Sequence, residues 1–241
     1  GPRTTGMHMQ IQKGGGFHYQ VAEKLGKPLD MAVAVGGDPS LILAAIMPLP
    51  EGLDEVAFSG IVRGKRTPLA KAKTVDLKVP AHAEFIFEGV VKPYIRRNEG
   101  PFGDHTGYYT LAEKYPAFHI TAITHRHDAV YPSTIVGPPP MEDFYLGTAS
   151  TRLFLPILKM NFPELLDIAL PAEGVFHNLV FVSIKKTYPM QAYKIMHGLW
   201  GMGQMMFAKY IIVVDDDVDV HNTSEVLFRL GACTDPQRDS L

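Results

Sequence analysis

Near the middle of the chain stands Glu99-Gly-Pro-Phe-Gly-Asp104-His-Thr-Gly-Tyr-Tyr109, a stretch that combines turn-forming residues with two acids. Its proline fixes one backbone angle, and the glycines on either side adopt conformations that other residues resist. The stretch therefore predicts a tight turn. Such a turn can hold the carboxyl groups of Glu99 and Asp104 near each other.

The two acids of this turn are candidates for proton transfer. Two neighbouring carboxylates repel each other, so one of them tends to keep its proton near neutral pH. A protonated carboxyl can act as a general acid, while its ionised neighbour acts as a base or as a clamp. The alternative is a surface turn with two solvated acids, and the stretch alone leaves both interpretations open.

The composition is that of an ordinary globular protein. The chain has 241 residues, of which 46% are hydrophobic and 20% charged, enough for one large or two modest domains. The formal net charge of −2 does not indicate a nucleic-acid surface, and no apolar run is long enough to span a bilayer. No secretory signal is visible, and the single cysteine, Cys233, excludes an internal disulfide. These features fit a reducing compartment, so we expect a cytoplasmic protein.

The pattern of apolar and turn-forming residues changes near residue 147. Before it, several strand-like segments follow one another without long helices, which is typical of a barrel or compact sheet. After it, helices and strands alternate as in an α/β domain. We therefore expect two domains, 1–147 and 148–241. The expected strands are 7–13, 31–35, 69–74, 84–91, 117–126, 129–136, 165–170, 179–184 and 210–214.

Glycine and proline positions predict where helices begin and end. The run Gly14–Gly16 is expected to break the chain before a short helix that Gly26 ends. Pro39 suits the first position of a helix, with Asp38 as its cap. The expected helices are 17–25, 40–45, 55–60, 148–160, 189–208 and 224–230. The apolar segment 210–214 is of the kind buried in a parallel sheet.

Two further groups of residues could carry chemistry. His8, His18 and Glu55 offer imidazole and carboxylate ligands that suit Mn²⁺, Mg²⁺ or zinc, and a structural role for the histidines is the alternative. Gly14–Gly16 could cradle a phosphate through backbone N–H groups, with Lys13 as a nearby cation. A flexible turn and a solvated lysine are the alternative here.

A series of motifs along the chain resembles the UbiD family of decarboxylases. The most specific is the turn at 99–109, which matches E-G-P-F-G-[DE]-x-x-G-Y. The other matching stretches are 5–19, 35–39, 47–52, 73–80, 134–143, 154–156, 214–220 and 235–239. They occur in the family's order and cover essentially the whole chain.

The resemblance implies reversible non-oxidative decarboxylation of an aromatic or α,β-unsaturated carboxylic acid. It implies prenylated FMN, a flavin bearing an extra ring, as electron sink, with a divalent metal, usually Mn²⁺, and a nearby K⁺. It also implies a mixed α+β fold, in which a split-barrel flavin domain precedes an α/β domain used in oligomerisation. Because family members are usually about twice as long, we expect a leading segment and a tail in the full protein.

The same resemblance assigns roles to the acids of the turn. Asp104 matches the donor of the proton that replaces the carboxylate, and Glu99 matches the acid that helps hold the cofactor and tunes its partner. The arginine position of the family falls at Lys13. A lysine keeps the charge but loses the bidentate geometry of a guanidinium.

Other matching positions concern the cofactor and its ions. Glu55, His18 and His8 match metal ligands, and Asp239 matches a residue of the K⁺ site. The cofactor-binding positions are Met47, Pro48, Ile11, Gln12, Lys13, Gly14 and His18.

Two positions depart from the family pattern. Gly203 stands where relatives often place a basic residue toward the cofactor phosphate, and Cys233 stands where many have an arginine near the K⁺ site. Each departure could weaken cofactor retention. Together with Lys13 they motivate an alternative, a non-catalytic flavin-binding or assembly module.

The resemblance extends to substrate and partners. A polyprenyl-hydroxybenzoate step of quinone biosynthesis is the expected reaction, and decarboxylation of a small phenolic or heteroaromatic acid is the alternative. The expected partners are a flavin prenyltransferase that supplies the cofactor and further copies of the chain. A hydrophobic substrate would also favour a peripheral association with the membrane.

Overall fold

The computed structural model describes Met7, Met9 and the ranges 14–50 and 52–241. The chain separates into two compact units. The first contains the described residues up to Asp104 together with 108–133, and the second contains 105–107 together with 134–241. Helices and strands mix in both units, which confirms the expected α+β class. The domain boundary that we expect near residue 147 stays a prediction.

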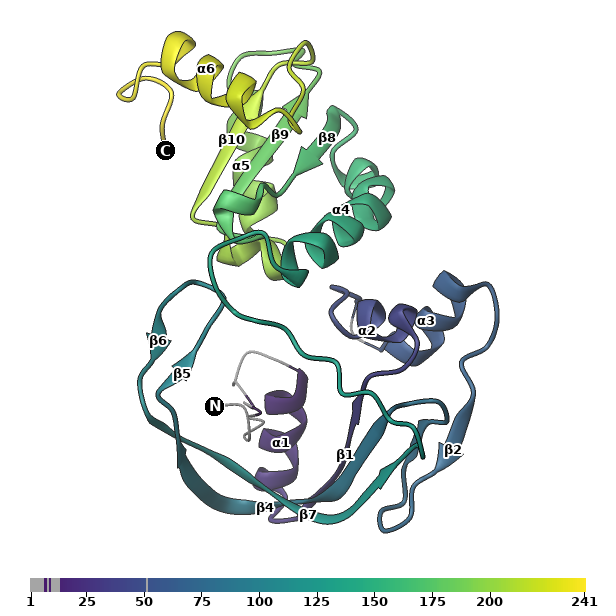
Figure 1. Cartoon of the computed structure of the whole chain (residues 1–241). Helices are drawn as coiled ribbons and strands as arrows, with labels where there is room; N and C mark the ends of the chain where they lie inside the picture. The colour runs from purple at the N-terminus through teal and green to yellow at the C-terminus, as the bar shows by residue number, and fades with distance from the viewer. Residues whose placement is uncertain (1–6, 8, 10–13, 51) are drawn as a thin grey trace. The chain divides into compact units, whose positions relative to one another are not determined.

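In the first unit, a curved antiparallel sheet carries a helix in its concavity. The sheet has the order β1-β4-β7 and consists of β1 (Leu29–Val35), β4 (Phe85–Glu99) and β7 (Glu113–His125). Two smaller pairs are β2 (Leu69–Lys71) with β3 (Lys78–Pro80) and β5 (Phe102–Gly103) with β6 (Tyr109–Thr110). The helices are α1 (Gly14–Lys24), α2 (Pro39–Ala45) and α3 (Glu55–Arg63). The long strands β4 and β7 bend around α1 (Figure 1).

The start of α2 follows the sequence prediction. The Asp38 side chain accepts a hydrogen bond from the backbone N–H of Ser40 at 3.0 Å, and Pro39 occupies the first helical position. The next helix, α3, is capped in the same way by Asp54, whose carboxylate accepts from the N–H of Ala57 at 2.8 Å. An N-terminal cap of this kind contributes about 1 kcal/mol to helix stability.

The glycine run before α1 departs from the prediction. Gly14–Gly16 forms the first turn of the helix instead of breaking the chain before it. Glycine costs about 1 kcal/mol relative to alanine inside a helix, and of the three glycines only Gly16 is buried. The helix ends where the sequence indicates, because Gly26 has a φ of +64° and donates to the carbonyl of Glu23 at 2.9 Å.

Several strands of the first unit differ in length from the prediction, and one predicted strand is absent from the described residues. β4 and β7 extend well beyond 84–91 and 117–126, while the segment 69–74 keeps only three strand residues. The segment 129–136 is not a strand. Its Pro132 has no N–H to donate, and the N–H of Val130 binds the Glu84 carboxylate at 3.0 Å instead of a neighbouring strand. The expected strand at 7–13 falls mostly outside the described residues.

The second unit is built on a three-stranded sheet of order β10-β9-β8. Its strands are β8 (Leu165–Ala169), β9 (Leu179–Ile184) and β10 (Tyr210–Val214), with β9 parallel to β10 and antiparallel to β8. Its helices are α4 (Glu142–Asn161), α5 (Gln191–Trp200) and α6 (Thr223–Cys233), with short 3₁₀ turns at Ala172–Gly174 and Gly203–Phe207. The parallel pairing predicted for 210–214 is confirmed, although β10 lies at the sheet edge.

The prediction of one long helix over 189–208 is wrong. The α-helix ends at Trp200, and a 3₁₀ turn beginning at Gly203 follows it. Two closely spaced glycines, Gly201 and Gly203, make continued helix costly. The indole N–H of Trp200 donates to the carbonyl of Ala208 at 2.8 Å, which closes the resulting turn.

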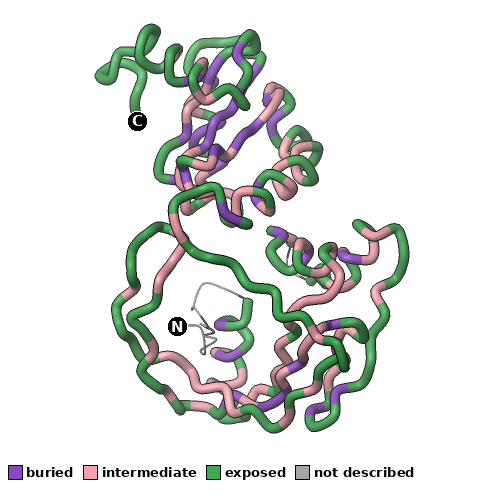
Figure 2. Tube along the Cα trace, in the orientation of Figure 1, coloured by how far each residue is buried: buried purple, intermediate pink, exposed green. Residues whose placement is uncertain are grey.

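The core of the second unit lies around β8 and β9. Figure 2 shows the continuous buried stretch along β9, which contains Val180, Phe181 and Val182, all fully buried. Leu165 and Ile168 of β8 are also fully buried. Each such side chain contributes about 1.5–3 kcal/mol on burial. Among the described residues, none of the helices is long and apolar enough to cross a membrane.

Candidate active site

The tight turn predicted at 99–109 is present at the end of β4. Glu99 is the last residue of that strand, and Gly100 follows with a φ of +101°. A Cβ at position 100 would lie 3.0 Å from the carbonyl oxygen of Leu111 and 3.2 Å from the Cα of Ala112. Both the backbone angle and the close approach therefore require glycine there.

A small hairpin places Asp104. Phe102 pairs with Thr110, and Gly103 pairs with Tyr109. Asp104 is the first residue after β5, and its N–H donates to the carbonyl of Tyr108 at 3.1 Å. Its side chain is held on a hydrogen-bonded hairpin, and the residue is partly exposed to solvent.

Two residues near Glu99, Glu113 and Tyr115, belong to the candidate site although the sequence did not indicate them. In the β4–β7 ladder Glu99 stands directly opposite Glu113. The hydroxyl of Tyr115 donates to Glu113 at 3.4 Å. Burial raises the pKa of Tyr115, and the negative charges of Glu113 and Glu99 raise it further. Acidic charge is thus concentrated where β4 enters the turn.

The first turn of α1 suits an anion. It begins with three glycines and contains no acidic residue, and a side chain at Gly14 would meet nothing within 4 Å. Helix N-termini bind phosphate groups through such uncovered N–H groups. His18 lies on the same helix, exposed, with its ring 5.7 Å from that of Phe17. Four predicted site residues just before this helix, His8, Ile11, Gln12 and Lys13, lie outside the described residues.

The other predicted ligands come from the region of α2 and α3. Glu55 is exposed in the first turn of α3, where the helix dipole favours a carboxylate. Met47, which follows α2, is buried, and Pro48 beside it is exposed. Within 14–50 and 52–241 no group of three acidic, histidine or cysteine side chains could hold a metal ion. Because the predicted metal set includes His8, it stays a prediction.

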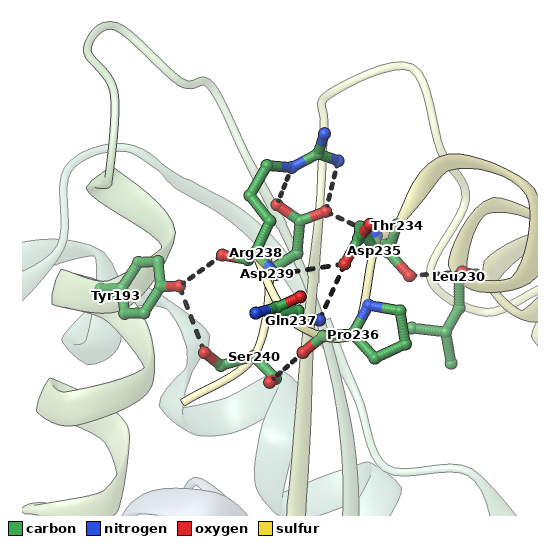
Figure 3. A network of polar contacts seen from close by, with 9 residues as sticks. All are labelled: Tyr193, Leu230, Thr234, Asp235, Pro236, Gln237, Arg238, Asp239 and Ser240. Carbon is green, nitrogen blue, oxygen red and sulfur yellow. Dashed lines mark hydrogen bonds and ion pairs between the residues drawn. The ribbon is translucent and has the colours of Figure 1, made fainter.

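Asp239 lies in a polar network of the second unit (Figure 3). Arg238 donates to both of its carboxylate oxygens, at 2.8 and 2.6 Å, and the N–H of Asp235 donates at 2.8 Å. The hydrogen bonds from Arg238 lower the pKa of Asp239 to about 2. A K⁺ ion at Asp239 would compete with this guanidinium, and the K⁺ site stays a prediction.

A cavity of about 450 Å³ lies beside this network. Its lining includes Cys233, which is exposed, and the ion pair of Arg229 with Asp217 at 2.7 Å. The charged side chains that line the cavity form ion pairs with one another, so the cavity favours neither a cation nor an anion. Gly203, the other departure from the family pattern, has a φ of +47° at the start of its 3₁₀ turn.

Two family sequence models together match almost the whole chain. The 3-octaprenyl-4-hydroxybenzoate carboxy-lyase Rift-related domain matches residues 1–139. The C-terminal domain of the same carboxy-lyase matches residues 144–241.

Relatives and solved structures agree with these matches. An uncharacterized protein of Archaeoglobus fulgidus is 54% identical over 98% of this chain and 50% of its own length. An uncharacterized protein of Aquifex aeolicus is 51% identical over 98% of this chain and 49% of its own. The chain therefore spans about half the length of these relatives.

Among solved structures, the UbiD-class enzyme HmfF of Pelotomaculum thermopropionicum, in an evolved dimeric form with prFMN, is 30% identical. Its TM-score is 0.82, over 92% of this chain and 51% of that one. The closed form of vanillic acid decarboxylase from Sedimentibacter hydroxybenzoicus is 28% identical, with a TM-score of 0.88 over 97% of this chain and 50% of that one. With both family models matched in order along its length, the chain belongs to the UbiD family.

Proposed function

We propose that this chain is part of a carboxy-lyase that reversibly and non-oxidatively decarboxylates an aromatic or α,β-unsaturated carboxylic acid with prenylated FMN. The observation that carries the proposal is the hydrogen-bonded hairpin on which Asp104 lies, since the sequence motif matches this residue with the family's proton donor. Membership in the family over nearly the whole chain supports the reaction class.

Asp104 acts as the general acid in this proposal. Its carboxyl group delivers a proton to the substrate carbon that loses CO₂. The hydrogen-bonded hairpin limits the motion of its backbone, and such positioning lowers the entropic part of a reaction barrier. Glu99 supplies a second carboxylate that can accept hydrogen bonds from the cofactor.

The chain's own groups can hold the cofactor. When bound, prenylated FMN supplies the electron sink for decarboxylation. The N–H groups of Gly14–Gly16 would bind its phosphate, aided by the dipole of α1. His18 and Glu55, with His8, would hold Mn²⁺, and Met47 with Pro48 would contribute to binding the flavin.

The comparisons support two substrate classes, a polyprenyl-hydroxybenzoate and a small phenolic acid. The family description favours a polyprenyl-hydroxybenzoate and a step of quinone biosynthesis. A solved relative is a vanillic acid decarboxylase, which favours a small phenolic acid. A polyprenyl substrate would further favour peripheral association with membranes. Whichever acid is used, the proposal includes a homo-oligomer and a flavin prenyltransferase that supplies the cofactor.

The test uses the protein at its natural full length, produced together with a flavin prenyltransferase. The absorbance spectrum and the mass of the released cofactor show whether prenylated FMN is bound. Release of CO₂ is then measured with vanillate and with a polyprenyl-hydroxybenzoate. We expect modified flavin and turnover with at least one acid. Absence of both contradicts the proposal, and bound flavin without turnover of any acid favours the non-catalytic module.

Substitution of the acid refines this test. Asp104→Asn should lower turnover by about 10²- to 10⁴-fold with the cofactor retained, since general acids contribute that much. Asp128→Asn, at an exposed carboxylate 3.5 Å from Arg126, is the matched control and should leave turnover unchanged. Unchanged turnover in Asp104→Asn would remove Asp104 from its role.

A further inference from the structure

A polar cluster in the first unit ties α1 to β4. We call the four residues Tyr19, Glu23, Tyr94 and Arg96 the α1 latch. Arg96 donates to both oxygens of the Glu23 carboxylate, at 2.8 and 2.9 Å. The Tyr19 hydroxyl donates to Glu23 at 2.6 Å, and the Arg96 guanidinium stacks 4.9 Å from the centre of the Tyr19 ring. Glu23 therefore receives a bidentate, charge-assisted pair, which fixes orientation as well as distance.

The backbone of β4 is shaped to meet the helix. In the ladder with β7, Val91 pairs with Phe118, whereas the next pair is Arg96 with Pro116. Four residues of β4 thus stand opposite a single residue of β7, which is a large bulge. Bulges redirect side chains, and they often occur beside functional sites.

Tyr94 lies inside this bulge with a φ of +62°, a conformation that non-glycine residues rarely adopt. The conformation directs its N–H to the Glu23 carboxylate at 2.8 Å. Its hydroxyl donates to the main-chain carbonyl of Glu23 at 2.9 Å. A strained backbone conformation persists only where the surrounding structure holds it. Here the N–H and the hydroxyl of Tyr94 both bind Glu23 of α1.

Apolar burial alone does little to hold α1. Only Gly16 and Tyr19 of the helix are buried, whereas Phe17 and Val21 are exposed, as is Leu25 directly after the helix. Tyr19 packs with Val91 of β4 and with Met9. The rotation and height of the helix on the sheet thus depend on this one packed ring and on the ion pair beside it.

We propose that the α1 latch is a positioning device that presents His18 and the N–H groups of Gly14–Gly16 to the phosphate and metal of the cofactor. The inference rests on the proposed function, because it is that function which places these groups at the cofactor. His18 directly precedes Tyr19 on the same rigid helix, so a rotation of the helix moves both. Arg96 and Glu23 are positioning residues and touch no reacting group.

The test compares Arg96→Met with Arg96→Lys and with the control Arg126→Met. Methionine keeps most of the apolar stem, and lysine keeps the charge without the bidentate geometry. Arg126→Met removes an arginine that directly follows β7 and pairs at 3.5 Å with Glu84, the residue just before β4. Tyr94→Phe, which removes a single hydroxyl, serves if Arg96→Met fails to fold.

Two readouts are measured on the full-length protein. The first is hydrogen exchange of peptides covering 14–24, and the second is the affinity for FMN and for Mn²⁺ by titration. We expect Arg96→Met to speed exchange in α1 and to weaken both affinities about 10- to 100-fold, the range found when residues behind metal ligands are removed. Arg96→Lys should recover part of the loss, and Arg126→Met should change neither readout.

Each outcome decides a different point. Unchanged exchange in α1 overturns the latch, whatever the protein binds. Faster exchange with unchanged affinities overturns the positioning role. If the unmodified protein binds neither FMN nor Mn²⁺, the proposed function fails, and with it the positioning of a cofactor. The exchange data then still decide whether Arg96 holds the helix.

Discussion

Glu88 of β4 offers a sharp test of how the first unit is held together. Its side chain is almost fully buried, with 1% exposed. One of its oxygens accepts hydrogen bonds from the N–H of Lys73 at 2.7 Å, from the N–H of Thr74 at 2.6 Å and from the Thr74 hydroxyl at 3.1 Å. A buried carboxylate therefore anchors the loop that joins β2 to β3.

The perturbation is Glu88→Gln, which keeps the shape and one acceptor oxygen but removes the charge. A hydrogen bond to a charged group contributes about 1.5–3 kcal/mol and a neutral one about 0.5–1.5 kcal/mol. Three donors share one oxygen, so the separate losses do not add fully. We expect the substitution to destabilise the loop by about 2 kcal/mol, which corresponds to a roughly 30-fold larger equilibrium constant for opening and so to faster hydrogen exchange.

The assay is hydrogen exchange followed by mass spectrometry on peptides covering 69–80. The only tryptophan, Trp200, lies in the second unit, so its fluorescence reports that unit and serves as an internal reference. Asp30→Asn, at an exposed acid of β1, is the matched control. Equal exchange in Glu88→Gln and the unmodified protein at pH 7 would refute the anchoring role.

The pH dependence gives a second check on the same residue. Burial raises the pKa of Glu88, but the hydrogen bonds from Lys73 and Thr74 outweigh it, and the pKa lies below its ordinary value of 4.5. Since the folded pKa is the lower one, the stability due to the charge is present above pH 4.5 and is lost as the pH falls through the folded pKa. The difference between the two proteins should therefore shrink below pH 4.5. A difference that stays constant there would contradict this account.

Two further predictions concern the candidate site. Glu55→Gln should lower bound Mn²⁺ and bound flavin together, measured by metal analysis and absorbance, and full retention of both would refute the ligand assignment. Gly100→Ala should distort the turn, because its Cβ would lie 3.0 Å from the Leu111 carbonyl at a φ of +101°, and should lower both the midpoint of thermal unfolding and turnover. Gly107→Ala, with a positive φ but nothing within 4 Å, is the control that separates steric contact from backbone strain.

Local signals in the sequence predicted local structure well. The cap at Asp38, the end of α1 at Gly26 and the turn at Gly100 each follow from one residue type whose backbone or side chain suits one conformation. The apolar segments 165–170, 179–184 and 210–214 also correspond to strands. Such features depend on neighbours within a few positions, and a sequence displays those directly.

Features set by distant pairing could not be predicted in this way. Glu113 faces Glu99 only because β4 and β7 pair in a particular register. The ion pair of Glu23 with Arg96 joins residues 73 positions apart. No local pattern distinguishes these groups from ordinary solvated charges. The glycines Gly14–Gly16 also lie within α1 although the sequence predicts a break there, because glycine is compatible with either conformation and no local pattern decides between them.

The bulge in β4 links the latch to the acids of the turn. Before the bulge, Val91 pairs with Phe118, and continuing that register would set Glu99 opposite Thr110. After the bulge, the register has moved by three positions, so that Glu99 stands opposite Glu113 and Arg96 opposite Pro116. A shift of an odd number of residues also exchanges the faces on which later side chains lie. One irregularity therefore brings Arg96 to α1 and at the same time sets the position at which the strand delivers Glu99 to the turn. The helix that would hold the cofactor phosphate and Glu99, the acid that would help hold the cofactor, therefore depend on the same short ladder, from 96 to 99.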